Sequence, residues 1–594
     1  MLVAAVPAQA QNSDKPDQPS APETERGIDY DVRFEGPLEK ALLEFLRETS
    51  LLVLLKDKPP ASRAALEKRA QADLERLGTA LRSEAYYAAA LTYDLDTSVS
   101  PAVVIISIET GVLYLLADFT IRYTEERPGT ARPSDLEEIG LHVGMTARAP
   151  EIRDAEERLI ATLAETGFPF AEVKNRRIVV DHDETTLSVE LEVEAGPLLA
   201  FGPVEVDGVT DVESNYVRVL LAWRTGERYD RRKVDASLQA LRATNLFASV
   251  SIEPGERPAG DGEVPMRVRV EERAARSVGG GLSWSTADGF LAELFWEHRN
   301  LYGRNETLRL TGRGGQLEQG GAIRLTKPNF VHLNQTGAAG LEAKNRETDA
   351  FDERSLAATV GLERRSKKIW RTGVGGALEY LDLEEEEEPD SRQFLLFSVP
   401  VSVTRDTSDD LFDPSQGTRV TLSLAPSVGT LEENIYFLTA SAAMAGYRAI
   451  DRENRFVLAG RLKLGSIFSK DTTDIPASKR FFAGGGGSVR GYEFQSVGPL
   501  DAQDDPIGGR SLIETNLELR IKLTETIGIV PFLDGGAVYR EIWPSGDEDF
   551  QVAAGLGFRY FTEFVPLRLD IAFPLNPRDV DDTFQFYISL GQAF

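Results

Sequence analysis

Residues 275–594 are built from short segments in which apolar and polar side chains alternate. In Leu517–Leu523 every odd residue is apolar and every even residue is charged, and Leu567–Phe573 follows nearly the same rule. Successive side chains of a strand point to opposite faces, so this pattern predicts strands with one apolar and one polar face. We count about sixteen such segments, from Ser277–Trp284 to Phe584–Phe594.

Two kinds of sheet share this pattern: a soluble sheet with one wet face, and a membrane barrel with an apolar outside and a polar lumen. An even number of antiparallel strands favours the barrel, because closure satisfies every backbone donor and acceptor within lipid. No run of about 18 apolar residues occurs, so transmembrane helices are not expected. We therefore predict an all-β, 16-stranded antiparallel transmembrane barrel over residues 275–594.

The connectors give this barrel a direction. In outer-membrane barrels the outer loops are the longer ones, and here they would follow the odd strands. Long connectors are expected around Glu384 and from Ser469 to Arg510, whereas Asn300–Asn305 and Thr524–Glu525 are short. The stretch Thr407–Gly417 is the exception, a long connector after an even strand.

The first half of the chain repeats with a period of about 80 residues. A helix end that runs into a strand recurs at Leu81, Leu163 and Leu241, and each copy is followed by a closing strand with alternating apolar residues. Amphipathic spacing, as in Ile152, Ala155, Leu159 and Leu163, places helices in each unit.

We therefore predict three α+β repeats, each a strand, two helices and two strands, over residues 27–111, 112–197 and 198–274. A small sheet of this kind keeps an exposed edge where another extended chain can dock. The alternative is that the repeats act as spacers.

Residues 1–26 precede these repeats. Ala8-Gln9-Ala10 fits a small-x-small cleavage site, and the following residues are rich in Pro, Ser and acidic side chains. We interpret the segment as a signal-peptide remnant and linker. An ordinary disordered tail is the alternative.

A glycine-rich stretch, Arg480–Tyr492, stands in the long connector between the expected strands eleven and twelve. A phosphate-binding loop would need Lys-Ser or Lys-Thr after the glycines and then a helix, and neither follows. Consecutive glycines instead allow a tight backbone path in a confined space.

Within that stretch, Val489, Arg490, Gly491 and Tyr492 resemble the signature of the sixth outer loop of the Omp85 superfamily. The resemblance implies that the loop folds into the lumen and that its arginine pairs with an acid of the barrel wall. The matching acid is Asp534, provided that its face of strand thirteen points inward. A buried guanidinium without a counter-charge costs on the order of 3–5 kcal/mol. The alternative is that Arg490 is a solvated loop residue.

Other segments carry the same resemblance. Phe201–Val209 is similar to the first strand of a polypeptide-transport-associated (POTRA) domain, and Arg405–Gly417 resembles the turn after strand eight. The aromatic end of the chain resembles the assembly signal of outer-membrane barrels; its residues are Phe584, Phe586 and Phe594.

The seam between the first and last strands is the expected working part. Gly279, Gly280 and Gly281 weaken the first strand, because glycine adds entropy cost and no side-chain packing. A weak seam would let the barrel open sideways and offer its edge to a client strand.

Several functions are excluded or left without support. A net charge of −29 argues against nucleic acid as a partner. The chain has no cysteine and four scattered histidines, so no metal site or cofactor is expected. No nucleophile elbow or paired catalytic carboxylates occur, so we expect no catalytic residue and no enzyme.

Three repeats before the barrel resemble the TamA branch of the superfamily. The resemblance implies a bacterial outer-membrane location with the arm in the periplasm, and insertion or translocation of client β-barrel and autotransporter polypeptides through the seam. Its implied partners are the outer-membrane bilayer, unfolded outer-membrane clients, and a TamB-like protein anchored in the inner membrane. A BamA-like central assembly subunit, a two-partner-secretion pore and a passive channel are the alternatives.

Overall fold

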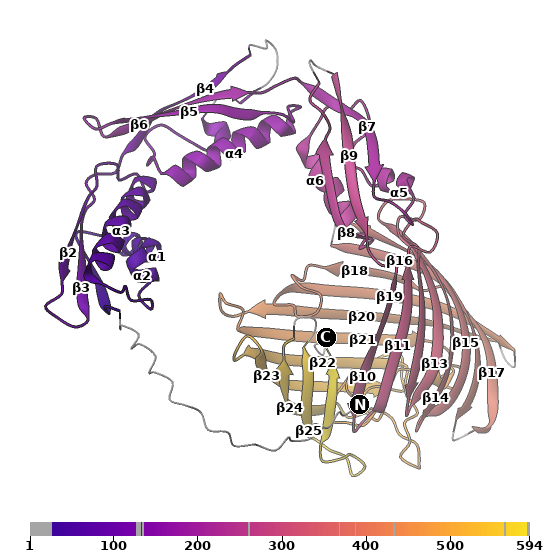
Figure 1. Ribbon diagram of the computed structural model, residues 1–594. Coiled ribbons are helices and arrows are strands. Elements are labelled where there is room, and N and C mark those ends of the chain that lie inside the picture. The colour runs from indigo at the N-terminus through magenta and orange to yellow at the C-terminus, as the bar shows by residue number, and fades with distance from the viewer. Residues whose placement is uncertain are drawn as a thin grey trace, which may run out of the picture. The chain divides into compact units, whose positions relative to one another are not determined.

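A computed structural model of the protein (Figure 1) describes residues 27–125, 132–133, 136–258, 262–367, 369–385, 388–431, 434–562 and 566–590. The segment interpreted as a signal-peptide remnant and linker, residues 1–26, lies outside the described residues. Among the helices of the described part, none is long and apolar enough to cross a bilayer.

The arm contains three three-stranded sheets with the orders β1-β3-β2, β4-β6-β5 and β7-β9-β8. In the first two sheets the first strand is parallel to the last, which lies antiparallel to the middle one. The elements are β1 (Tyr30–Glu35), α1 (Lys40–Thr49), α2 (Leu51–Leu54), α3 (Arg63–Ser83), β2 (Ala90–Asp96), β3 (Ala102–Glu109), β4 (Leu115–Tyr123), η1 (Glu137–Ile139), α4 (Ala149–Glu165), β5 (Glu172–Asp181), β6 (Thr186–Glu194), β7 (Leu199–Asp207), α5 (Ser214–Val219), α6 (Arg231–Arg242), β8 (Phe247–Pro254) and β9 (Gly262–Glu272).

The helices differ from the expected two per unit. The first unit has three, and the second has one α-helix, α4, preceded by the short 3-10 turn η1. Gly140, at a φ of 76°, ends η1 after a single turn, so no second helix forms there. The predicted apolar face of α4 is buried against its sheet, as Ile152, Ala155, Leu159 and Leu163 show. Each predicted arm range contains one sheet, and the domain boundaries themselves stay a prediction.

The predicted barrel is confirmed: β10 to β26 form a closed antiparallel sheet. Val399 and Pro400 interrupt one strand, whose two parts, β17 and β18, both pair with β16 and β19, so the labels stand for sixteen strands. The elements are β10 (Arg276–Ser285), β11 (Gly289–Arg299), β12 (Thr307–Gly315), β13 (Glu318–Lys327), β14 (Gln335–Thr348), β15 (Phe351–Ser366), β16 (Trp370–Glu385), β17 (Glu388–Ser398), β18 (Val401–Asp406), β19 (Gln416–Leu431), β20 (Ile435–Ala449), β21 (Phe456–Phe468), η2 (Ala477–Lys479), β22 (Ser511–Lys522), β23 (Ile527–Tyr539), β24 (Gln551–Tyr560), β25 (Leu567–Pro574) and β26 (Gln585–Leu590).

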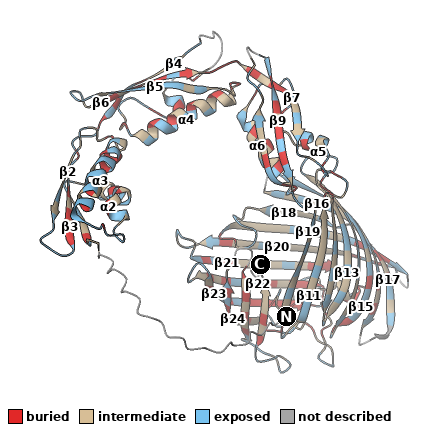
Figure 2. Ribbon diagram, in the orientation of Figure 1, coloured by how far each residue is buried: buried red, intermediate tan, exposed pale blue. Residues whose placement is uncertain are grey.

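The two faces of the barrel differ in chemistry. Apolar side chains such as Val278 and Leu294 are exposed on the outside, and polar side chains such as Glu514 and Glu518 are buried inside. Many residues of β22 to β25 are buried (Figure 2), and a second buried group, which includes Phe351, Leu381 and Phe394, lies on β15 to β17. An apolar exterior around a polar interior is what a bilayer requires of a barrel.

The connectors correct two expectations. No long loop forms around Glu384: β16 continues to Glu385 and β17 begins at Glu388, because the strand ladders with β15 and β17 extend that far. The first connectors after odd strands are short turns, residues 286–288, 316–317 and 349–350. The long connector predicted between β21 and β22 is present and spans residues 469–510.

Candidate functional site in the barrel lumen and at the seam

Residues 469–510, here called the lumen loop, fold back into the barrel and pack against β22, β23 and β24. Glycine makes its tightest bends possible. Gly491 has a φ of +104°, and a Cβ placed on it would lie 2.7 Å from the Cβ of Ala553. Gly484 has a φ of +110°, and a Cβ there would lie 2.3 Å from the Glu493 carbonyl oxygen. Only glycine fits at these two positions.

Arg490 lies at the centre of the loop with 1% of its surface exposed. Its Nε donates to Oδ2 of Asp534 at 2.5 Å, and its Nη2 donates to Oδ1 at 2.9 Å. The guanidinium carbon also lies 3.5 Å from the ring centroid of Phe532. This two-point contact fixes the orientation of the planar guanidinium as well as its charge.

Two further carboxylates complete the site. Nη1 of Arg490 donates to Glu518 on β22 at 2.9 Å and to Asp570 on β25 at 3.0 Å. Sequence reasoning named Asp534 and missed both. The signal was present, because the alternating segments Leu517–Leu523 and Leu567–Phe573 carry these acids on their polar faces.

Other arginines share these acids. Arg520 donates to Glu518 at 3.0 Å, Arg568 donates to Asp570 at 2.6 Å, and Arg559 also donates to Asp570. Glu518 and Asp570 are therefore held by arginines of the barrel wall as well as by Arg490 of the loop.

The other residues of the tetrad support this placement. Val489 is fully buried among apolar residues of the loop and of β22 to β24. The hydroxyl of Tyr492 lies 3.1 Å from the Val552 carbonyl oxygen and from Oδ1 of Asn576. The structure thus brings Val489, Arg490, Tyr492 and Asp534 together, and their functional roles stay predictions.

In the part of the chain that the structure describes, the seam between β10 and β26 is the shortest strand pairing of the barrel. Among the described residues, β10 pairs with β26 only at Trp284↔Ile588 and Ser285↔Tyr587. By contrast, the ladder between β15 and β16 runs without interruption from Asp352 to Ser366. Within the described residues, so short a pairing means a low cost of separating the two strands.

The three seam glycines lie in the part of β10 that shows no pairing with β26 in the described residues. A Cβ on Gly279 would lie 2.4 Å from the Phe295 ring, whereas Gly281 has open space around it. Gly279 therefore makes room for the Phe295 ring of the neighbouring strand β11.

The lumen loop contacts both sides of the seam. The backbone N–H of Gly491 donates to the hydroxyl of Tyr587 on β26 at 3.0 Å. Gly486 donates to Oδ2 of Asp288, in the turn after β10, at 3.4 Å. Asp288 in turn accepts from Ser285 at 3.0 Å, so the loop and the two seam strands form one hydrogen-bonded unit.

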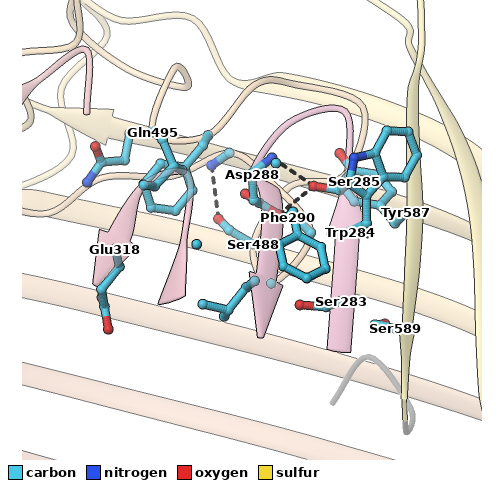
Figure 3. Close-up of a pocket in the computed structure, with 18 of the residues that line it drawn as sticks. Ser283, Trp284, Ser285, Asp288, Phe290, Glu318, Ser488, Gln495, Tyr587 and Ser589 are labelled. Atoms are coloured by element: carbon cyan, nitrogen blue, oxygen red, sulfur yellow. Dashed lines mark hydrogen bonds between the residues drawn. The ribbon is translucent and has the colours of Figure 1, made fainter. Parts of the chain in front are cut away.

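A cavity of about 770 Å³ lies inside the barrel beside the seam (Figure 3). Ser283 and Ser285 of β10, Tyr587 and Ser589 of β26, and Ser488 of the loop line it. Polar side chains from both seam strands thus face a shared space that can admit an extended backbone.

The C-terminal residues are placed only in part. Phe586 lies in β26, and its ring centroid is 6.2 Å from that of Trp284. Phe584 lies just before β26 rather than in it, because the strand begins at Gln585. Phe594 lies outside the described residues.

Comparisons with known proteins agree with this geometry. Residues 300–594 match the sequence model of the Omp85 superfamily domain. The barrel half of this chain belongs to the Omp85 superfamily. Residues 200–273 match the POTRA model, described as a surface antigen variable number repeat. With both matches, this chain is an outer-membrane protein whose POTRA arm lies in the periplasm.

Two relatives illustrate the similarity. Outer membrane protein assembly factor BamA of Nitratidesulfovibrio vulgaris is 23% identical over 462 residues, which are 75% of this chain and 58% of the relative. Outer envelope protein 80, chloroplastic, of Arabidopsis thaliana is 25% identical and covers 59% of this chain and 51% of the relative. The chain thus spans little more than half the length of these relatives.

A solved structure shares the fold. The crystal structure of BamA from Haemophilus ducreyi lacking POTRA domains 1–3 has a TM-score of 0.70 and 17% identity, and it covers 81% of this chain and all of that one. The bacterial relative and this structure carry the name BamA, so the finer resemblance to TamA stays a prediction.

Proposed function

We propose that this protein is a non-enzymatic outer-membrane assembly factor that inserts or translocates unfolded outer-membrane client proteins through the seam between β10 and β26. The observation that carries the proposal is the short seam, two residue pairs among the described residues, beside a cavity lined by side chains of both seam strands. Relatives named as outer membrane protein assembly factors support it.

The chemistry of the seam suits an extended client. A strand edge with unsatisfied N–H and C=O groups is a template for another strand. The inner-facing Ser283 of β10 and Ser589 of β26 line the adjoining cavity (Figure 3). A client strand would therefore pair with β10 while its polar side chains enter the cavity.

The lumen loop would control this opening. Its contacts to Tyr587 and to Asp288 hold opposite sides of the seam, and the Arg490 cluster holds the loop in place. Separating the strands therefore requires breaking at least one of these contacts. The few hydrogen bonds concerned, each about 1 kcal/mol, keep the opening reversible.

A disulfide lock tests the proposal. The chain has no cysteine, so Ser283→Cys with Ser589→Cys introduces a single possible disulfide across the seam. We expect the oxidised variant to lose assembly of an unfolded outer-membrane client into lipid vesicles, and reduction to restore it. Ser423→Cys with Ser441→Cys is the matched control, because this pair joins β19 and β20 in an ordinary ladder.

The lock also separates the competing functions. Client assembly that survives in the oxidised seam variant would contradict the seam route and favour a two-partner-secretion-type pore through the lumen. Equal loss of activity in the control pair would show that rigidity in general, rather than the seam, is responsible.

We further propose that the arm docks a TamB-like protein that spans the periplasm from the inner membrane, as a TamA-type factor would require. The three small sheets, whose outer strands include β2 and β5, support this. Affinity purification of the full-length chain from solubilised envelope tests it. Recovery of clients without such a partner would contradict the TamA assignment and favour a BamA-like subunit.

A further inference from the structure

An apolar groove of about 570 Å³ lies on the barrel wall across four neighbouring strands, β13 to β16. Small residues, Gly337, Ala339 and Gly376, form its floor, and Val360 and Leu362 stand beside them. Val360 is 63% exposed and pairs with Ala339 on one side and with Gly376 on the other. Paired residues share a face of the sheet, so the groove faces outward, toward the bilayer.

The groove lies at the periplasmic end of the wall. β15 ends at Ser366 and β16 begins at Trp370, and the short turn between them is on the side where the arm enters the barrel. Trp370 is 38% exposed. Phe330 covers the end of the groove, because its ring atoms lie 3.0 Å from where a Cβ on Gly337 would be. Aromatic side chains of this kind suit the level of lipid headgroups.

Exposed cations stand beside the groove at this level. Arg364 lies two residues beyond Leu362 on the same face of β15, and Lys367 lies in the turn. Arg405 of β18 is paired in register with Trp370, and its Nη1 lies 3.5 Å from Oγ1 of Thr418. The outward apolar hollow is thus bordered by positive charge on its periplasmic side.

We propose that this groove binds one anionic phospholipid of the periplasmic leaflet, with an acyl chain over Gly337 and Gly376 and the phosphate near Arg364, Lys367 and Arg405. A hollow on a wall that faces lipid is filled by acyl chains. Cations at headgroup level attract anionic lipid, with about a fivefold gain in affinity per charge. The proposal rests on the membrane location of the barrel and not on its role in assembly.

Native mass spectrometry of the full-length chain in detergent tests the site, with phosphatidylglycerol and phosphatidylcholine as probes. We expect one retained phosphatidylglycerol and at least a fivefold preference over phosphatidylcholine. Arg364→Gln with Arg405→Gln should lower the affinity for phosphatidylglycerol by about 25-fold. Gly376→Leu should remove the retained lipid, because the new side chain occupies the groove.

Matched controls make the outcome specific. Arg448→Gln removes an exposed arginine from the periplasmic end of β20, and Gly446→Leu adds the same side chain where a Cβ would meet only Thr418 at 4.0 Å. Both controls should leave lipid retention unchanged. Equal loss in the controls, equal retention of the two lipids, or a dimer that Gly376→Leu dissociates would each overturn the proposal, the last in favour of a second copy of the chain.

Discussion

The hydroxyl of Tyr587, on the last strand, accepts a hydrogen bond from the backbone N–H of Gly491 in the lumen loop at 3.0 Å. Gly491 follows Arg490, whose guanidinium is bound by three carboxylates of the barrel wall. One hydrogen bond therefore joins the ion-paired loop to one edge of the seam, so the state of the loop and the state of the seam are coupled.

Removing this hydroxyl should loosen the seam. Tyr587→Phe keeps the ring but leaves a buried N–H without an acceptor, at a cost of about 1–3 kcal/mol to the closed state. In the Ser283→Cys, Ser589→Cys background we expect slower disulfide formation. Tyr560→Phe, at an exposed position of β24, is the control and should have no effect. An unchanged rate in Tyr587→Phe would mean that the loop and the seam are not coupled.

Removing the arginine should destabilise the barrel. Arg490→Ala leaves Glu518, Asp534 and Asp570 without their shared cation, and breaking a buried pair in this way costs about 3–5 kcal/mol. Arg490→Lys should recover only part of the loss, because an ammonium cannot make the two-point contact. Thermal unfolding in detergent measures both variants.

The exposed Arg452, in the turn between β20 and β21, is the control for charge alone. Arg452→Ala should unfold at the temperature of the unmodified protein. An Arg490→Ala barrel as stable as this control would show that the cluster does not hold the loop.

The glycines of the lumen loop should differ sharply in their tolerance. Gly491→Ala forces a side chain into a positive φ and against Ala553, which should cost about 1–3 kcal/mol and displace the tetrad. Gly487→Ala is the matched variant, because a Cβ there meets nothing within 4 Å. Hydrogen exchange of the loop amides should increase in the first variant only. Equal exchange in both would contradict the tight path described for the loop.

The end of the third arm sheet should respond to acid. Burial raises the pKa of Glu272, but the backbone N–H groups of Thr210, Val212 and Asp211 donate to its carboxylate and bring the pKa below the ordinary 4.5. A lowered folded-state pKa stabilises the fold above pH 4.5, and this contribution is lost as the pH falls through the lowered value.

Glu272→Gln should therefore unfold more easily at neutral pH and lose this part of the acid dependence. Thermal unfolding between about pH 3 and about pH 7, a range that includes the ordinary carboxyl pKa, measures both effects. The exposed Glu256→Gln is the control. Identical pH profiles for Glu272→Gln and the unmodified protein would contradict the assignment.

The sequence predicted the parts of this fold that depend on local periodicity. Two-residue alternation indicated the barrel strands. Asp534 could be placed on the same face as Phe532 because residues two apart in a strand point to the same side. This alternation does not say which strands meet across the lumen. Glu518 and Asp570 were therefore missed as partners of Arg490, although both lie on alternating segments already identified as strands.

Strand ends were harder to predict than strand centres. The acidic run near Glu384 suggested a loop, but cross-strand pairing carries β16 to Glu385 despite its charge. In the second arm unit the sequence suggested two helices, and a left-handed Gly140 limits the first to one turn. Tertiary pairing and a single backbone angle decide such cases, and neither is visible in a periodic pattern.

Capture of a client in transit tests the seam route most directly. Single variants Ser283→Cys and Ser423→Cys place one thiol beside the seam and one on the lumen-facing side of β19. A stalled outer-membrane client with one cysteine in its last strand should form a disulfide with residue 283 and not with residue 423. Equal capture at both positions, or capture at residue 423 alone, would contradict the seam as the path of the client.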